Sequence, residues 1–264
     1  MKSSPGTALL EIVLAETTRD TILGGRVTIF QPVRGYRAAI DPVLLAAAVP
    51  AGPGEAVLDA GSGSGAASLA LARRCGGVSV TGLEVQGPLV AMARDSAREN
   101  GLDGRVRFLE GDLLRPPEEL APEGFDHVMA NPPYISARHG NPPPDPSRRA
   151  ATVEGDAVLA DWLGFLLSRA GDGATITVIH RFDRAREVSD GLKAVGAGDL
   201  VIFPLWRTRR NGEAMRVIVQ ARKGGACKIR TADGLVLHDG EGAYTAAAEA
   251  VLRRGRGFRF KQGI

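Results

Sequence analysis

Short apolar segments alternate with helical patterns through most of this chain, and this alternation limits the fold more than any other feature of the sequence. Five strands are expected at 55–59, 78–83, 106–109, 125–130 and 174–179. Helices are expected at 66–75, 88–100, 157–170 and 184–194. Strands that alternate with helices form a parallel sheet covered on both faces. The sequence therefore predicts an α/β fold.

The alternation of strands and helices stops near the end of the core. Two strands, at 200–206 and 215–221, follow each other without a helix between them, so we expect them to pair antiparallel and to complete a seven-stranded sheet. Outside this core we expect a short strand at 27–31, a helix beginning at Pro42 with Asp41 as its N-cap, and a helix at 243–254. The expected organisation is an N-terminal extension (1–50) packed on the core, a core domain (51–223) and a basic C-terminal tail (224–264) that is not an independent domain.

Composition excludes several classes of protein. The 264 residues are 44% hydrophobic and 24% charged, as in ordinary globular proteins. The longest apolar stretch, at 43–49, is too short to cross a bilayer, and no secretory signal pattern opens the chain. Two cysteines, Cys75 and Cys227, make neither a disulfide framework nor a four-ligand zinc site. We expect a cytoplasmic protein with no membrane partner.

Positive charge is concentrated toward the C-terminus. Residues 201–264 carry 13 of the 33 Lys and Arg side chains but only 5 of the 30 Asp and Glu side chains. Such a concentration attracts a phosphate backbone. Arg207, Arg209 and Arg210, which follow the sixth strand, are the first candidates for RNA contacts. The alternative is a solvated surface that balances the acidic part of the chain.

A glycine-rich loop joins the first strand of the core to its helix. It contains Asp59, Gly61, Ser62, Gly63 and Gly65. Glycines in this position allow the backbone to approach a nucleotide, and the helix N-terminus offers unpaired N–H groups. Glu84 follows Gly63 by 21 residues, where a carboxylate can accept the hydroxyls of a ribose. The loop by itself fits both a nicotinamide dinucleotide and S-adenosyl-L-methionine (SAM).

An acidic residue also follows the third strand. Gly111-Asp112 stands directly after it, where the Asp112 side chain can accept a hydrogen bond from an adenine amino group. We expect Asp112 to complete the cofactor-binding set.

The tetrad Asn131-Pro132-Pro133-Tyr134 follows the fourth strand, at the edge where open α/β sheets bind ligands. It suits a planar amino group whose lone pair is delocalised. The Asn131 side-chain oxygen and the Pro132 carbonyl can each accept one N–H, which directs the lone pair at a sulfonium methyl, and Tyr134 offers a ring on which a base can stack. We expect Asn131, Pro132 and Tyr134 to be catalytic, with Asn131 also bordering the cofactor. A dinucleotide enzyme has no need for this tetrad, which favours SAM.

Metal chemistry is not expected. The four histidines, His127, His139, His180 and His238, show no paired ligand spacing. His127 falls within a strand and is expected to be structural. Methyl transfer from a sulfonium needs no metal, so none is assigned.

Together, the glycine loop, Glu84, Asp112 and the Asn131–Tyr134 tetrad resemble those of the class I SAM-dependent amino-methyltransferases. The resemblance implies a Rossmann-like seven-stranded sheet with a terminal antiparallel hairpin and SAM as the cofactor. Two families share the tetrad in this order. One methylates adenine N6 in tRNA, and the other methylates the glutamine amide of peptide release factors.

The segment from Gln31 to Asp41 favours the first of these families, since it resembles that of the bacterial tRNA1(Val) (adenine-N6)-methyltransferases, as does the tail around 237–254. The release-factor family carries a helical domain before the core. The resemblance implies tRNA as partner, transfer to the adenine beside the anticodon, and Tyr36 and Arg37 as candidate substrate contacts. Ser64 and the proline-rich segment 136–149 depart from the family pattern. The alternatives are an amino-methyltransferase of rRNA, DNA or release-factor glutamine, and a non-catalytic RNA-binding module.

Overall fold

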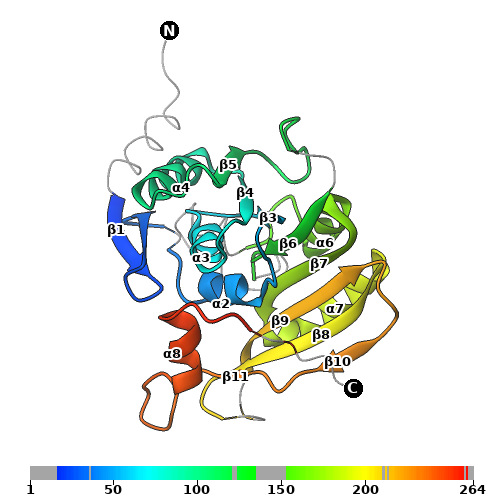
Figure 1. Cartoon of the computed structure of the whole chain (residues 1–264). Helices are drawn as coiled ribbons and strands as arrows, with labels where there is room; N and C mark the ends of the chain where they lie inside the picture. The colour runs from blue at the N-terminus through cyan, green and yellow to red at the C-terminus, as the bar shows by residue number, and fades with distance from the viewer. Residues whose placement is uncertain are drawn as a thin grey trace.

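The computed structural model describes residues 17–35, 37–120, 124–134, 153–209, 212, 214–258 and 260. Its centre is a nine-stranded mixed sheet (Figure 1). The strands of this sheet are β3 (Ala56–Ala60), β4 (Ser79–Glu84), β5 (Val106–Glu110), β6 (Phe125–Ala130), β7 (Ala170–Arg181), β8 (Ala197–Trp206), β9 (Ala214–Lys223), β10 (Ile229–Thr231) and β11 (Leu235–Val236). Their order is β10-β8-β9-β7-β6-β3-β4-β5, with β11 also paired to β8.

The predicted α/β fold is confirmed. Strands β3 to β7 are parallel, and β8 and β9 pair antiparallel as expected. The sheet is wider than seven strands because β10 and β11, from the tail, add in parallel to β8. Strand β3 has β4 on one side and β6 on the other, so the order of the chain reverses there. Open α/β sheets bind ligands at the carboxyl ends of the strands at this reversal.

Helices cover both faces of the sheet (Figure 1). They are α2 (Asp41–Ala48), α3 (Ala66–Arg74), α4 (Gly87–Glu99), α6 (Leu159–Arg169), α7 (Ala185–Ala194) and α8 (Ala246–Leu252), with a 3-10 turn, η1 (Phe182–Arg184). Successive side chains of a strand point to opposite faces. On β3, Val57 accordingly packs in the core layer formed with α2, α3 and α4, and Leu58 packs in the layer formed with α6 and α7.

The first helix of the structure begins differently from the expectation. Asp41 was expected to be its N-cap, and this is wrong: Ile40 occupies the N-cap position, without a capping side chain, and Asp41 is the first helical residue. The Asp41 carboxylate is directed instead to two side chains from other parts of the chain. A local sequence pattern cannot reveal such long-range partners.

An antiparallel hairpin of β1 (Thr17–Ile22) and β2 (Val27–Pro32) packs against α4. The Phe30 N–H donates to Ser96 Oγ at 2.8 Å. The Asn100 side chain accepts the Thr28 N–H at 3.0 Å and donates to the Thr28 carbonyl at 2.6 Å. These bonds replace sheet pairing at the outer side of the hairpin and fix it to the helix.

The tail folds back over the core. Its helix α8 is shorter than the expected 243–254, because Thr245 caps it by accepting the Ala248 N–H at 3.1 Å. Farther along, the Phe258 N–H donates to the Ala47 carbonyl at 2.7 Å, and its ring centroid lies 4.7 Å from that of Phe203. These contacts attach the tail to α2 and β8.

Candidate active site

The glycine-rich loop turns sharply between β3 and α3. Gly61, Gly63 and Gly65 all have positive φ, at 70°, 55° and 84°. The N–H groups of Gly61 and Ser62 both donate to the Leu83 carbonyl, at 2.8 and 3.0 Å. A Cβ at Gly61 would lie 2.6 Å from the Trp162 ring. The close approach of Trp162 therefore requires glycine at this position, in addition to the left-handed backbone.

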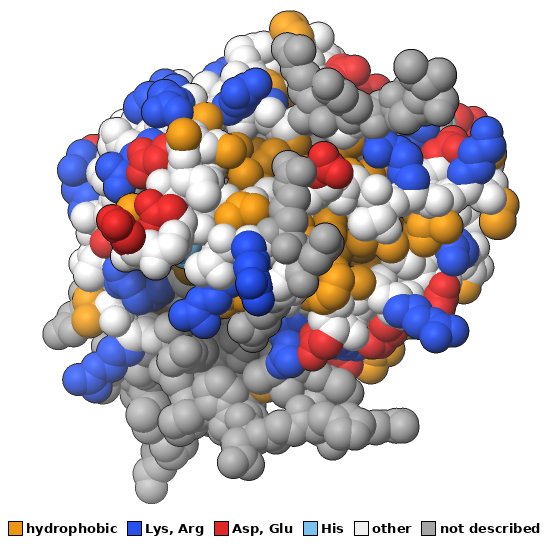
Figure 2. All heavy atoms as spheres, turned by 90° about the horizontal axis from the view of Figure 1, so that it is seen from below, with side chains coloured by type: hydrophobic (Ala, Val, Ile, Leu, Met, Phe, Trp, Pro, Cys, Tyr) orange, Lys and Arg blue, Asp and Glu red, His pale blue; other side chains and the backbone are white. Residues whose placement is uncertain are grey.

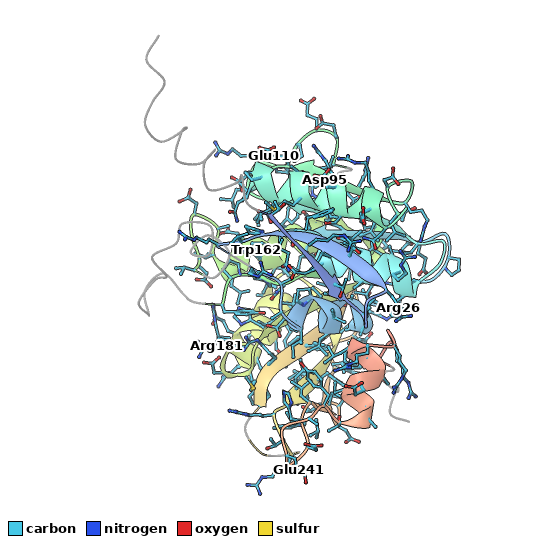
Figure 3. All side chains as sticks on the ribbon, turned by 90° about the vertical axis from the view of Figure 1, so that its left-hand side faces the viewer. Arg26, Asp95, Glu110, Trp162, Arg181 and Glu241 are labelled. Atoms are coloured by element: carbon cyan, nitrogen blue, oxygen red, sulfur yellow. The ribbon has the colours of Figure 1, made fainter. Side chains whose placement is uncertain are left out.

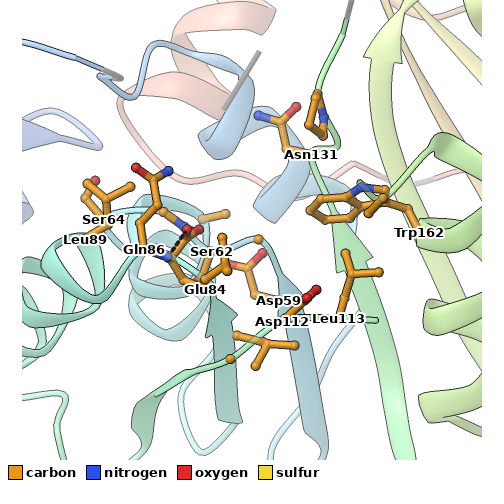
Figure 4. Close-up of a pocket in the computed structure, with 18 of the residues that line it drawn as sticks. Asp59, Ser62, Ser64, Glu84, Gln86, Leu89, Asp112, Leu113, Asn131 and Trp162 are labelled. Atoms are coloured by element: carbon orange, nitrogen blue, oxygen red, sulfur yellow. Dashed lines mark hydrogen bonds between the residues drawn. The ribbon is translucent and has the colours of Figure 1, made fainter. Parts of the chain in front are cut away.

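The end of β4 is joined to this loop through a carboxylate. Glu84 is buried, and its Oε2 accepts the Gly63 N–H at 2.9 Å while its Oε1 accepts the Gln86 N–H at 2.9 Å (Figure 4). Burial raises the pKa of Glu84, and these backbone donors act in the opposite direction. Each oxygen keeps a second lone pair, so the carboxylate can still accept hydroxyl groups.

Asp59 lies at the end of β3, beneath the loop. Its side chain is buried, and Ser68 Oγ donates to its Oδ2 at 2.6 Å. Burial raises the pKa of Asp59 to about 7, although the hydrogen bond from Ser68 favours the carboxylate. A cationic group placed next to Asp59 would therefore find a carboxyl that ionises readily at neutral pH.

These elements surround a cavity of about 360 Å³, a size ordinary for a ligand site (Figure 4). The structure brings together on its wall most of the residues expected to bind the cofactor, namely Asp59, Gly61, Ser62, Gly63, Glu84, Asp112 and Asn131. Gly65 is not on the wall. A Cβ there would lie 2.6 Å from the Phe108 ring, so this glycine allows α3 to pack closely on the sheet.

Several lining residues were not anticipated. Trp162, from α6, covers the loop, and Val85, Gln86 and Leu113 follow the ends of β4 and β5. Trp162 lies 97 residues after Gly65, the last glycine of the loop, and is separated from every motif, so no local pattern could have placed it. In the view of Figure 3, Trp162 lies on the same side of the molecule as Arg181, at the end of β7.

The tetrad after β6 borders the same cavity. Asn131 and Pro133 line it, and Pro132, between them, is buried. The Tyr134 hydroxyl lies 2.5 Å from Asn131 Oδ1 and 2.8 Å from Asp41 Oδ2. The Arg216 guanidinium lies over the Tyr134 ring, 4.6 Å from its centroid. A cation therefore covers one face of this ring.

His180, on β7, makes a T-shaped contact with Tyr134, with 5.3 Å between the ring centroids and 70° between the ring planes. Burial and the nearby Arg184 charge lower the pKa of His180 to about 4, against the opposing effect of a hydrogen bond to the Pro133 backbone. Its Nδ1 accepts the Arg181 N–H at 2.9 Å, so the proton of the neutral ring is on Nε2. His180 is therefore a neutral packing partner at physiological pH.

His127 has the structural role expected of it. Its Nδ1 lies 2.6 Å from Thr175 Oγ1, and its Nε2 lies 3.0 Å from Glu55 Oε2. In the part of the chain that the structure describes, no three His, Cys, Asp or Glu side chains converge as a metal site would require. The same part of the chain contains no helix that is both long and apolar enough to span a membrane.

The residues expected to contact RNA differ in their surroundings in the structure. Tyr36 and Arg210 lie outside the described residues. Arg37 donates to Asp20, to Thr18 and to the Pro32 carbonyl, so its guanidinium holds the N-terminal hairpin, and its role toward RNA stays a prediction. Arg207 and Arg209 are exposed after β8. Within the described residues, neither side chain makes an ion pair or a hydrogen bond.

A family model described as a methyltransferase domain matches residues 57–142. A tRNA1(Val) (adenine(37)-N6)-methyltransferase from Shewanella amazonensis is 27% identical over 219 residues, covering 83% of this chain and 91% of that protein. A release factor glutamine methyltransferase from Moorella thermoacetica is 33% identical over 147 residues, covering 53% of this chain. The chain spans 51% of the length of this release-factor enzyme, and its match to two others spans 27% and 26% of theirs.

Among solved structures, the chain is similar to a predicted O-methyltransferase from Agrobacterium tumefaciens. The TM-score is 0.68 with 25% sequence identity, and the match covers 82% of this chain and 97% of the other. The chain therefore carries a class I SAM-dependent methyltransferase domain, with SAM as its cofactor.

The residues of the cavity fit this cofactor. Ser62 Oγ and Trp162 Nε1 are buried and have no hydrogen-bond partner among the described residues, which leaves both available to a polar ligand. The Glu84 carboxylate retains acceptor capacity for ribose hydroxyls. Val85 and Leu114 line the cavity yet are 59% and 42% exposed, so a planar apolar group such as adenine would cover them.

Proposed function

We propose that this protein transfers a methyl group from SAM to the exocyclic N6 amino group of an adenine in tRNA, beside the anticodon. The observation that carries the proposal is that Glu84 and Asn131, from the ends of β4 and β6, line one cavity. An acceptor for the cofactor ribose and an acceptor for a substrate amine thus border the same space. The relative from Shewanella amazonensis, which this chain matches over 91% of its length, supports the choice of substrate.

The chemistry follows from the residues after β6. When bound, SAM supplies a methyl group on a positively charged sulfur. The Asn131 side-chain oxygen and the Pro132 carbonyl accept the two N–H bonds of the adenine amine and draw its lone pair out of conjugation with the ring. The amine held in this way would be placed to accept the methyl group that SAM supplies, and solvent would take the proton that the nitrogen then loses. Since the nitrogen carries positive charge after transfer, this proton loss needs no strong base, in keeping with the neutral state of His180.

The Tyr134 ring and the walls of the cavity would select a planar base. Adenine must leave its stack to reach Asn131, and an aromatic face compensates for part of that cost. The face of the Tyr134 ring opposite Arg216 is the one we assign to the base.

Contacts to the RNA backbone are assigned to Arg207 and Arg209. Strand β8 runs parallel to β7, because both pair antiparallel with β9, so the loop after Trp206 lies at the same edge of the sheet as Asn131. Exposed guanidinium groups at this edge suit phosphates. By contrast, several basic side chains of the tail and its approach are used within the protein, including Arg222, Lys223, Arg230 and Arg253.

The distribution of charge supports this narrow assignment. On the face seen in Figure 2, Lys and Arg side chains are interleaved with Asp and Glu side chains and do not form one continuous basic patch. We therefore place the RNA contacts at the edge of the sheet and not across the whole C-terminal third.

The proposal is tested by supplying labelled SAM together with purified tRNA, rRNA or release factor. Label is expected in the tRNA fraction, and the Asn131→Ala variant should leave it unlabelled. Label only in rRNA or only in release factor would refute the assignment to tRNA while keeping transfer to an amino group.

Release-factor glutamine is the second candidate. Its amide nitrogen is also planar and delocalised, so Asn131 and Pro132 could activate it in the same way. The 33% identity to the Moorella thermoacetica enzyme favours this candidate, although that match extends over 53% of the chain. The release-factor arm of the same experiment distinguishes the two.

A further inference from the structure

Four side chains from distant parts of the chain meet behind the Asn131 wall of the cavity. Arg216 Nε, on β9, donates to Asp41 Oδ2 at 2.9 Å. The Tyr134 hydroxyl lies 2.8 Å from the same Asp41 oxygen and 2.5 Å from Asn131 Oδ1. The chain thus forms a connected series from Arg216 through Asp41 and Tyr134 to Asn131.

The arrangement of protons in this series depends on the partner to which the Tyr134 hydroxyl donates. The Tyr134 hydroxyl has a single proton and can donate to Asp41 or to Asn131, but not to both. A carboxylate is an acceptor only, whereas an amide offers an acceptor oxygen and a donor NH₂ group in nearly the same volume. A half-turn of the Asn131 amide exchanges these two groups. Whether the Tyr134 hydroxyl donates to Asp41 or to Asn131 therefore decides which end of the amide faces the cavity.

The ion pair with Arg216 determines that Asp41 accepts a hydrogen bond from Tyr134. The Arg216 guanidinium forms an ion pair with the Asp41 carboxylate, whose side chain is 14% exposed, and a carboxylate paired in this way can only accept hydrogen bonds. The same charge acts on Arg216, because the Asp41 carboxylate raises its pKa against the effect of burial. With Asp41 as an acceptor, Tyr134 donates to Asp41, and its oxygen can then only accept a hydrogen bond from Asn131. Starting from the orientation in which Oδ1 faces the hydroxyl, a half-turn of the Asn131 amide brings its NH₂ to Tyr134 and its carbonyl oxygen into the cavity.

We propose that Asp41 is a positioning residue for methyl transfer: through the Tyr134 hydroxyl it sets the orientation of the Asn131 amide, so that the oxygen and not the NH₂ meets the substrate amine. This inference rests on the proposed transfer to an amino group. An NH₂ group facing the substrate would oppose its N–H bonds and could not activate the nitrogen.

Hydrogen bonds of the segment before Asp41 fix the position of the backbone that leads into α2. Gln31 Oε1 accepts the Ala38 N–H at 2.7 Å, and Gln31 Nε2 donates to Asp20 at 3.0 Å. Arg37 also binds Asp20, at 2.7 Å. These bonds fix the segment that enters α2 and so hold Asp41 at the start of the helix, facing Tyr134. The polar residues of the 31–41 segment are thereby connected to the catalytic tetrad.

The test is a double-mutant cycle of Asp41→Ala and Tyr134→Phe. Rates are measured at saturating SAM on whichever of tRNA, rRNA or release factor the wild-type protein methylates. Asp41→Ala should lower kcat by about 10-fold to 100-fold, with the KM for the substrate and the Kd for SAM changed by less than about 3-fold. In the Tyr134→Phe background, Asp41→Ala should have no further effect on kcat, since the hydroxyl that transmits it is absent.

Two variants separate positioning from folding. Asp41→Asn keeps an acceptor oxygen for Tyr134 and Arg216, so it should restore kcat to within about 3-fold of wild type, which also covers the case in which Asp41→Ala unfolds. Asp190→Asn, which breaks an exposed ion pair with Lys193 on α7, is the matched control and should have wild-type rates.

Three results would overturn the inference. Equal effects of Asp41→Ala with and without the Tyr134 hydroxyl would show that Asp41 does not act through Tyr134. A fall in kcat for Asp41→Asn as large as for Asp41→Ala would show that charge, and not hydrogen-bond acceptance, matters. If the wild type methylates none of the three substrates, the inference falls together with the proposed function. The first two results would leave the proposed function intact.

Discussion

Glu84 Oε2 accepts a hydrogen bond from the Gly63 N–H at 2.9 Å, across the 21 residues that separate them. This bond joins the end of β4 to the centre of the glycine-rich loop. The cofactor loop and the carboxylate proposed to bind the ribose are therefore one structural unit, and a change in either affects the other.

Replacing Glu84 by Ala should weaken SAM binding by about 1–3 kcal/mol, because charge-assisted hydrogen bonds to the ribose are lost together with the support of Gly63. Isothermal titration calorimetry measures the change. Glu110 provides a matched control, since it is the register partner of Glu84 on β5 and does not line the cavity. Glu110→Ala should bind SAM as the wild type does, and unchanged affinity in Glu84→Ala would refute the role of Glu84.

Replacing Asn131 by Ala should act on rate and not on cofactor binding. Its proposed work is to direct the amine lone pair at the methyl group, an interaction made fully only in the transition state, so kcat should fall by roughly 100-fold or more. The Kd for SAM should stay within about 3-fold of wild type. Single-turnover kinetics with saturating SAM measures the rate, and a wild-type rate in this variant would show that the tetrad is only a turn.

Asp59 should make SAM binding dependent on pH. Its pKa in the folded protein is raised to about 7, and the positive sulfonium of SAM favours the carboxylate form. Affinity should therefore rise as pH increases from about 5.5 to 7 and then level off. Calorimetry on the wild type and on Asp59→Asn measures this, and the variant should lack the rise. A parallel pH dependence in both proteins would assign it to another group.

The same raised pKa predicts the direction of the stability change. Between the ordinary carboxyl value of 3.8 and about 7, the folded protein holds a proton on Asp59 that the unfolded chain has released. The contribution of Asp59 to the free energy of unfolding therefore falls as pH rises through this window, and is constant above it. In urea unfolding of the protein without SAM, Asp59→Asn should gain stability relative to wild type as pH rises from 4 to 7.

Arg207 and Arg209 should govern the salt dependence of tRNA binding. Replacing both by Ala should make the slope of log affinity against log salt shallower by about one unit for each lost phosphate contact, with SAM affinity unchanged. Filter binding over a range of salt concentrations measures the slope. Arg98 and Arg186, exposed on α4 and α7, form the control pair, and their double Ala variant should keep the wild-type slope. Equal slopes in all three proteins would mean that Arg207 and Arg209 only face solvent.

The fold could be predicted largely from local patterns. Each strand of the parallel sheet is a short apolar segment followed by a helical pattern, and β3 to β7 appear where this pattern places them. Strand β1, with the sequence TTRDTI, was not expected, because polar residues occupy most of its positions and it is held by pairing to β2 and not by burial. The short strands β10 and β11 escaped prediction for a related reason, since only the edge of β8 organises them.

The residues of the site also fall into two groups, those that the sequence could predict and those that it could not. Asp59, Gly61, Glu84 and Asn131 follow strand ends, and parallel topology brings strand ends together, so their meeting in one cavity could be expected from sequence. Trp162 and the contact between Asp41 and Tyr134 could not, because each depends on how a helix packs over the sheet. The tertiary contacts of Asp41 also explain why its local role as an N-cap was wrongly assigned.

The most direct test of the central claim is nucleoside mass spectrometry of tRNA after incubation with the protein and SAM. The proposed function predicts N6-methyladenosine in the digested tRNA, at the adenine beside the anticodon, and its absence when Asn131→Ala replaces the wild type. A tRNA pool that gains no methylated adenine, under conditions where calorimetry shows SAM bound, would contradict it.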